Sequence, residues 1–182
     1  MTTPIAPLHS NSRRVIETDR LHLRQFREDD AAFVLEIFND ASFMRFIGDR
    51  RVRTMDEART YIVKRLLANH HVEGMGPFLV QTRDTGISIG FCTLFRRDWL
   101  DAADLGFAFL PEYRSQGFAI EASRALLDHA RNEMEFDRLV AIASAENEAS
   151  ARLLRRLGFT ETGTIRPPGE EIDVVLFAID LD

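Results

Sequence analysis

The chain has 182 residues, of which 45% are hydrophobic and 29% are charged, and its formal net charge is −6. This balance is typical of a globular domain and excludes a disordered chain. The acidic charge and the lack of a basic stripe exclude a protein whose affinity depends on neutralising nucleic-acid phosphates. We therefore expect no nucleic-acid partner.

The amino-terminal segment and the single cysteine indicate the compartment. Residues 1–14 are polar and lack the apolar core of a signal peptide, so we expect a flexible leader followed by one domain over residues 15–182. No segment reaches the run of about 18 apolar residues that a membrane span needs, so we expect no membrane partner. Cys92 is the only cysteine, which excludes an intrachain disulfide and a cysteine-based metal cluster. These features favour a cytoplasmic protein without a metal.

The predicted elements begin with a strand over Ile16–Gln25, where apolar and polar residues alternate. A helix is expected after Asp29 and Asp30, either of which can serve as an N-cap. Thr54 and Glu57 have the spacing of a capping box and predict the start of a second helix, which we expect to end near residue 74.

A hairpin and a further strand follow the helical part of the chain. Phe78–Thr82 and Ile87–Leu94 are separated by Gly86, which predicts an antiparallel pair. Asp104–Leu110 is the next expected strand, and Pro111 ends it.

The last third of the chain alternates helices and strands. We expect a helix over Gly117–Glu133, a buried strand over Arg138–Ala145 and a short helix over Ala149–Leu157 that ends at Gly158. The closing strands are predicted at Phe159–Thr164 and Asp173–Leu181. This order predicts a mixed α/β (α+β) domain without internal repeats.

One strand–turn–helix junction has the pattern of an anion site. The turn Arg114–Phe118 connects the strand that ends at Pro111 to the next helix, whose first N–H groups are unpaired and point to one spot. Together with the helix dipole they suit a diphosphate, which Gly117 and the small Ala119 would allow to approach closely. Arg114 can add a charged, forked donor. The pattern alone fits a plain structural junction equally well.

A second pattern follows about thirty residues later. Asn147 is a good N-cap and Gly158 a good helix-ending residue, so this segment can be purely structural. With both patterns in view, the chain resembles the GNAT superfamily of N-acetyltransferases, through Arg114–Ala122 (RSQGFAIEA) and Asn147–Phe159. The stretch Glu17–Arg24 is similar to the subgroup that includes the Rim-type acetyltransferases of ribosomal proteins.

The resemblance covers residues 16–181 in element order and carries expectations about fold and cosubstrate. It implies a mostly antiparallel central sheet of about six or seven strands flanked by about four helices. It implies acetyl-CoA as the cosubstrate, with the pantetheine arm paired to the strand that precedes the turn. The residues it assigns to acetyl-CoA are Ala108, Phe109, Leu110, Arg114, Ser115, Gln116, Gly117, Phe118, Ala119, Asn147 and Ser150.

The catalytic residues are less clearly indicated. Many family members have a tyrosine seven residues after the asparagine, proposed to protonate the leaving thiolate, but this chain has Leu154. The resemblance therefore makes Ser150, near Asn147, the better candidate for that role. Glu170 is the candidate base that would receive the amine, although its acidic loop fits a solvated surface as well. A nucleophilic role for Cys92 is the weaker alternative to a buried strand cysteine.

The reaction implied is direct attack of a primary amine on the acetyl thioester. The amine would belong to a protein amino terminus or to a small molecule, and the protein would be a monomer or a homodimer. A non-catalytic acyl-CoA-binding or regulatory domain on the same fold is the alternative function, motivated by Leu154 and by the lack of a clear base. A nucleotide-binding module is disfavoured because neither a G-x-G-x-x-G nor a P-loop pattern is present.

Overall fold

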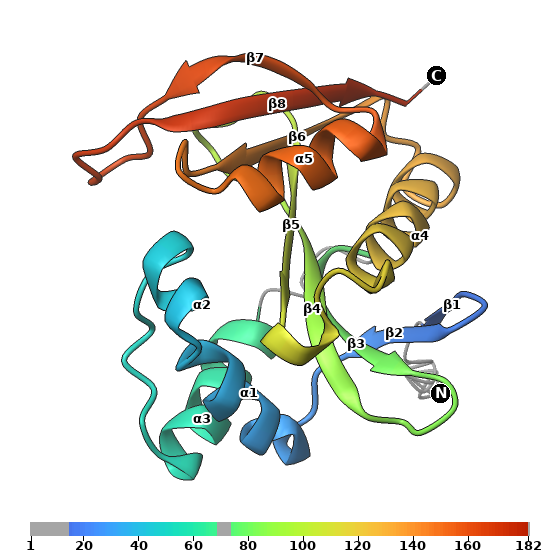
Figure 1. The fold of residues 1–182 in the computed structure, drawn as a ribbon, viewed down its shortest axis with the longest axis vertical. Helices are drawn as coiled ribbons and strands as arrows, with labels where there is room; N and C mark the ends of the chain where they lie inside the picture. Colours follow the sequence, from blue (N-terminus) through green and yellow to red (C-terminus); the bar gives the residue numbers. More distant parts are fainter. Residues whose placement is uncertain (1–14, 69–73, 182) are drawn as a thin grey trace, which may run out of the picture.

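The computed structural model describes residues 15–68 and 74–181, and the expected leader lies outside these residues (Figure 1). One eight-stranded sheet has the strand order β1-β2-β3-β4-β5-β6-β8-β7. All neighbouring strands are antiparallel except β5 and β6, which are parallel. The strands are β1 (Val15–Glu17), β2 (Leu21–Gln25), β3 (Gly76–Thr82), β4 (Ser88–Phe95), β5 (Ala103–Phe109), β6 (Arg138–Ala143), β7 (Thr160–Ile165) and β8 (Val174–Asp180).

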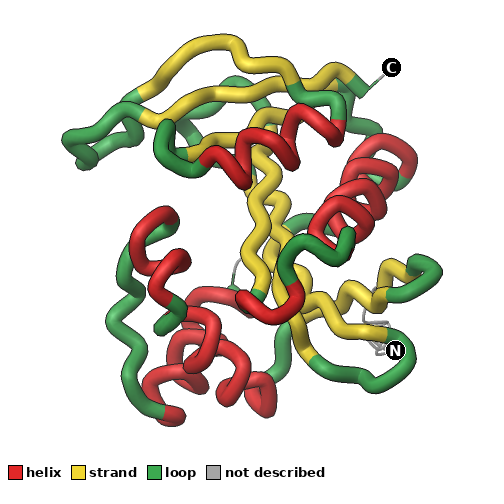
Figure 2. The backbone as a smooth tube through the Cα atoms, in the orientation of Figure 1, coloured by secondary structure: helices red, strands yellow, loops and turns green. Residues whose placement is uncertain are grey.

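Helices cover both faces of the central strands, with α1 to α3 on one side and α4 and α5 on the other (Figure 2). The helices are α1 (Ala31–Phe38), α2 (Ala41–Phe46), α3 (Met55–Tyr61), α4 (Phe118–Asn132) and α5 (Glu148–Leu157). Short 3-10 turns precede α1 and α4, at Glu28–Asp30 and Pro111–Tyr113, and α3 continues as a π-helix over Ile62–Leu67. The expected mixed α/β fold is confirmed, with one or two more strands and one more helix than expected.

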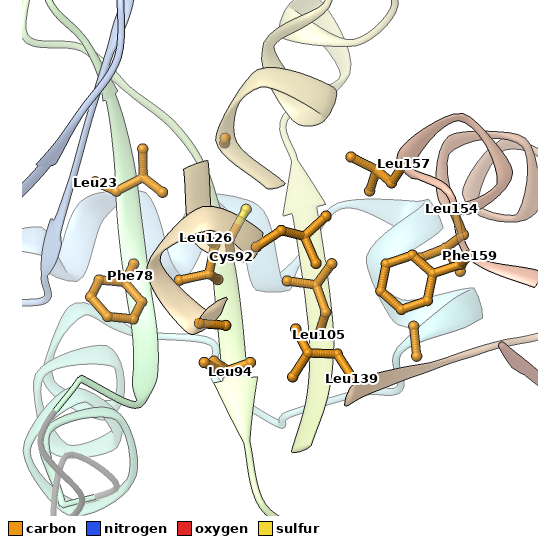
Figure 3. Close-up of a cluster of buried hydrophobic side chains, with 14 of the residues drawn as sticks. Leu23, Phe78, Cys92, Leu94, Leu105, Leu126, Leu139, Leu154, Leu157 and Phe159 are labelled. Atoms are coloured by element: carbon orange, nitrogen blue, oxygen red, sulfur yellow. The ribbon is translucent and has the colours of Figure 1, made fainter. Parts of the chain in front are cut away.

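The two-sided cover explains why the central strands are apolar throughout. Along β3, Phe78 and Val80 point into the core beneath α4 and α5, whereas Leu79 points into the core beneath α1 to α3. Figure 3 shows the first of these cores, where Leu154 and Leu157 of α5 lie with Leu105 of β5. Each such side chain contributes about 1.5–3 kcal/mol by leaving water. These layers hold β5 and the helix that follows it in a fixed relation.

Several local predictions are confirmed. Thr54 and Glu57 form the reciprocal capping box at the start of α3, with N–H to side-chain oxygen distances of 3.2 and 3.0 Å. Gly158 ends α5 in the left-handed region at φ +99°. The β3–β4 pair is antiparallel and turns at Gly86.

One prediction near the amino end is wrong, and one short helix is additional. The single strand expected over residues 16–25 is two antiparallel strands, because the chain turns at Thr18, whose N–H donates to the Leu21 carbonyl at 3.0 Å. The short helix α2 was not expected. Asp40 caps it by accepting from the Phe43 N–H at 3.0 Å, and the Phe43 ring stacks on Phe38 with centroids 4.9 Å apart.

Candidate active site

The sheet opens between its two parallel strands. β5 and β6 are paired only at Ala103–Leu139 and Asp104–Val140, whereas β5 continues to Phe109. In Figure 1, β5 leaves this junction and runs away from β6. The edge of β5 beyond Asp104 is therefore open to a ligand on the side that faces away from β4.

The register with β4 decides which main-chain groups of β5 face this open side. The Leu110 N–H donates to the Ile89 carbonyl at 3.0 Å, and antiparallel pairs alternate in their hydrogen bonding, so Leu110 and Ala108 direct their main-chain groups at β4. Phe109 and Phe107 direct theirs to the open side. Of the three strand residues assigned to the pantetheine arm, the structure thus leaves Phe109 with an N–H on this side. Phe107 has the same orientation, and the sequence carried no signal for it because the register was unknown.

The turn between β5 and α4 exposes a group of backbone donors. Ser115 and Gly117 both have left-handed conformations, with φ of +62° and +84°, and α4 begins at the next residue. A left-handed conformation is costly for serine and easy for glycine. Within the described chain, no hydrogen-bond acceptor faces the N–H groups of residues 115–120. These donors and the positive end of the α4 dipole have the chemistry that suits an anion.

Arg114 fastens this turn to two other elements. Its Nε donates to the Phe109 carbonyl at 2.8 Å, and its Nη2 donates to Asp40 Oδ1 at 2.8 Å. Burial alone would raise the pKa of Asp40, but hydrogen bonds from Ser42, Arg114 and the Phe43 N–H outweigh it and hold that pKa below its usual value. The guanidinium therefore holds the end of β5 and the start of α2 together beside the proposed anion site. Its Nη1 has no acceptor among the described residues.

The predicted residues at the start of α5 lie close to one another. Asn147 is the N-cap, and its Oδ1 accepts from the Ser150 N–H at 3.1 Å. This uses the side-chain oxygen of Asn147 and leaves its amide N–H groups and the Ser150 hydroxyl without partners in the described residues. Leu154, at the position of the usual tyrosine, is 1% exposed and packs in the core (Figure 3).

The candidate base and the cysteine are in different environments. Glu170 is exposed in the β7–β8 loop, which an ion pair from Arg166 to Asp173 closes at 2.7 Å. Glu170 makes no hydrogen bond to Asn147 or Ser150 in the part of the chain that the structure describes. Cys92 is fully buried in β4, and burial raises the pKa of its thiol to about 12, which is incompatible with a nucleophilic thiolate.

The described residues contain neither a group of metal ligands nor a membrane-spanning helix. Over residues 15–68 and 74–181, no three His, Cys, Asp or Glu side chains are grouped to hold a metal ion. No helix in these residues has the length and apolar character needed to cross a membrane.

The open strand edge and the turn lined with donors define an α/β domain with a site suited to an extended ligand that carries a phosphate group. A family model, the acetyltransferase (GNAT) domain, matches residues 20–160, so the chain belongs to the GNAT acetyltransferase family. The resemblance inferred from the sequence is confirmed, and the protein is an acetyltransferase.

The chain is also similar to individual proteins, and the solved structure shares its fold. The uncharacterized N-acetyltransferase YnaD of Bacillus subtilis (strain 168) is 29% identical over 159 residues, which cover 86% of this chain and 90% of YnaD. Spermidine N(1)-acetyltransferase of Escherichia coli (strain K12) is 24% identical over 144 residues, covering 79% of this chain and 74% of that protein. The structure of RimL, a ribosomal alpha-N-protein acetyltransferase in complex with coenzyme A, has a TM-score of 0.79 at 21% identity, covering 93% and 99% of the two chains.

Proposed function

We propose that this acetyltransferase transfers the acetyl group of acetyl-CoA directly to a primary amine. The observation that carries the proposal is the row of N–H groups at residues 115–120 that have no partner among residues 15–68 and 74–181, directly after a strand whose far edge is open. The diphosphate of acetyl-CoA would bind these donors, and the pantetheine arm would extend along β5. Phe107 and Phe109 are the strand residues with main-chain groups on the correct side.

The chemical step needs little from the protein beyond placement. The amine lone pair attacks the thioester carbon, the C–N bond forms and the C–S bond breaks. The nitrogen loses one proton and the sulfur gains one, so the products are the amide and the free thiol. The Phe109 N–H would stabilise the developing oxyanion. The Ser150 hydroxyl would pass a proton to the sulfur, directly or through water, and regain one from the proton that the amine nitrogen releases. Both groups lack partners in the described chain, so both are free to act.

The acceptor that this scheme favours is the α-amine of a polypeptide. An α-amine has a pKa of about 7.7–8.0 and is partly neutral near pH 7, whereas a lysine amine at about 10.4 needs a base. Glu170 and Glu171, exposed in the β7–β8 loop, would attract a cationic amine. A polyamine is the second candidate, which the similarity to the spermidine acetyltransferase favours.

The proposal is tested by ligand-dependent melting and by turnover. Acetyl-CoA and CoA should raise the melting temperature, and free thiol should appear when acetyl-CoA is mixed with a peptide that has an unblocked amino terminus. A panel containing such peptides, their N-acetylated forms and spermidine separates the two acceptor classes. Lack of stabilisation by millimolar acetyl-CoA would contradict the proposal. Stabilisation without turnover on any amine would favour the non-catalytic alternative.

A pair of glycine variants locates the diphosphate. Gly117→Glu should abolish CoA binding, because it places a carboxylate among the donors. Gly86→Glu is the matched control, since Gly86 also has a positive φ, +70°, but lies in the β3–β4 turn with open space around it. Both variants carry the same kind of backbone cost, so retained CoA affinity in Gly117→Glu would refute the placement.

A further inference from the structure

Two sequence segments that lie about a hundred residues apart meet at the start of α4. The turn between β1 and β2 places Arg20 and Thr18 against Glu121, in the first turn of the helix. The Glu121 carboxylate accepts from the Arg20 N–H at 3.0 Å, from Arg20 Nε at 2.6 Å and from the Thr18 hydroxyl at 2.6 Å. This carboxylate therefore fixes the guanidinium of Arg20 in one orientation.

The same guanidinium holds the turn that precedes the helix. Arg20 Nη1 donates to the Gln116 carbonyl at 3.1 Å, and the guanidinium carbon lies 4.5 Å from the centroid of the Phe118 ring. A trans peptide is planar with its C=O and N–H on opposite sides. Because the Gln116 carbonyl points to Arg20, the N–H of Gly117 in the same peptide must point away from Arg20. The contact thus sets the direction of one of the donors in the anion site.

Arg20 also offsets the negative charge of Glu121 at this end of the helix. A carboxylate in the first turn of α4 would repel a diphosphate bound a few residues earlier. Burial alone would raise the pKa of Glu121, but the hydrogen bonds from Thr18 and Arg20 outweigh it and hold that pKa below its usual value, so the group is ionised at pH 7. The guanidinium offsets this charge, and its Nη2 is 3.2 Å from the point that a Cβ on Gly117 would occupy. Positive charge is therefore retained beside the donors.

We propose that Arg20 is a positioning residue for the coenzyme A diphosphate: anchored by Glu121, it orients the Gln116–Gly117 peptide and offsets the helix carboxylate. The inference rests on the proposed function, because it requires acetyl-CoA to bind at this turn. It explains the motif Glu17–Arg24 by a direct contact of Arg20 with the turn before α4. Neither of these two sequence segments indicates that contact by itself.

The test compares two acetyl donors on Arg20→Met. Acetyl-CoA carries the diphosphate, whereas S-acetylpantetheine has the same thioester and arm without it. We expect kcat/KM for acetyl-CoA to fall about tenfold or more through KM, with kcat nearly unchanged, because charge-assisted contacts to the diphosphate site are lost. For S-acetylpantetheine, kcat/KM should change by less than about twofold. An equal loss with both donors would indicate a structural role and overturn the proposal, as would no loss with either.

A matched variant and a conservative one complete the design. Arg83→Met removes another exposed guanidinium, which holds the β1–β2 turn through the Thr18 carbonyl at 2.8 Å and makes no hydrogen bond or ion pair to α4 within the described residues. It should leave the KM for acetyl-CoA within about twofold of the unmodified chain. Arg20→Lys should recover only part of the loss, because one ammonium cannot bond Glu121 and Gln116 in the same fork. Full recovery with lysine would overturn the orienting role.

Failure of the proposed function is distinguishable. In that case calorimetry would detect no binding of CoA to the unmodified chain. This result would overturn both the proposed function and the inference. Binding of CoA with the same dissociation constant by the unmodified chain and by Arg20→Met would leave the proposed function standing and overturn the inference alone.

Discussion

Replacing Gly90 by alanine should destabilise the sheet beside the site. Gly90 is buried in β4 opposite Phe109, and its added Cβ would lie 2.6 Å from the Ala108 carbonyl oxygen and 2.7 Å from Phe109 Cγ. A carbonyl of the neighbouring strand cannot rotate out of the way, so β4 and β5 must separate. Overpacking of this kind costs about 1–3 kcal/mol, and we expect the upper end of that range here.

Gly106→Ala is the control for this perturbation. Its Cβ would meet only Thr93 Oγ1 closely, at 2.5 Å, and a change of the Thr93 χ1 angle would relieve this contact without moving a strand, so we expect a smaller cost, of about 1 kcal/mol. At about 2–4 °C per kcal/mol for a domain of this size, the melting temperature should fall by about 6–12 °C for Gly90→Ala and by about 2–4 °C for Gly106→Ala. These falls are upper values, because the smaller backbone entropy of unfolded alanine returns up to about 1 kcal/mol to both variants. The difference between the two variants is unaffected by this term.

The assay is thermal denaturation followed by circular dichroism, with CoA titrated into each folded variant. Gly90→Ala should also weaken CoA binding, since Phe109 moves with β5. A fall in melting temperature no larger for Gly90→Ala than for Gly106→Ala would refute the reasoning, because it would mean that the strand carbonyl does not constrain this position.

Three further predictions concern capping, pH and catalysis. Thr54→Ala removes one bond of the capping box with Glu57 and should cost about 1 kcal/mol, seen as a lower melting temperature; an unchanged value would contradict the cap's contribution. Burial raises the pKa of Asp104 above its usual 3.8, and Arg97 at 3.0 Å lowers it only in part. Between the pKa of the unfolded carboxyl and the higher pKa of the folded one, the folded state binds more protons than the unfolded state. The unmodified protein therefore loses stability as the pH rises from the first pKa to the second. Asp104→Asn, which can still accept from Arg97, should gain melting temperature relative to the unmodified chain as the pH rises above the usual carboxyl pKa of 3.8, and a difference that does not vary with pH would oppose this. Ser150→Ala should lower kcat about tenfold or more with little change in the KM for acetyl-CoA, measured by steady-state kinetics, and an unchanged kcat would limit Ser150 to starting the helix.

The elements that sequence patterns predicted well are those that local chemistry determines. The helix after the turn, the helix ended by Gly158 and the hairpin at Gly86 each depend on caps, positive φ values and periodicity within a few residues. The short helix α2 has a local cap in Asp40, but the contact of Phe43 with Phe91 joins it to a strand far along the chain. No local pattern predicts such a contact.

The candidate site shows the same division. The turn and its free donors follow from a short motif and a helix start. The direction of each N–H of β5 follows from its register with β4, which places Phe107 and Phe109 on the open side and Ala108 on the other. The contact of Arg20 with the Gln116 carbonyl joins segments that fold together only in the complete sheet. Orientation and long-range pairing are the parts that a single sequence does not contain.

The ion pairs that hold the site together consist of arginine and carboxylate, as in Arg20–Glu121 and Arg114–Asp40. The chain has a single lysine, Lys64, which is exposed on the π-helical segment. A guanidinium stays protonated and does not attack a thioester, whereas a lysine amine loses its charge when it is acylated. The ion pairs of this acetyltransferase therefore cannot be neutralised by reaction with an acetyl donor. Chemical self-modification can neutralise one side-chain amine, and that amine lies outside every ion pair described above.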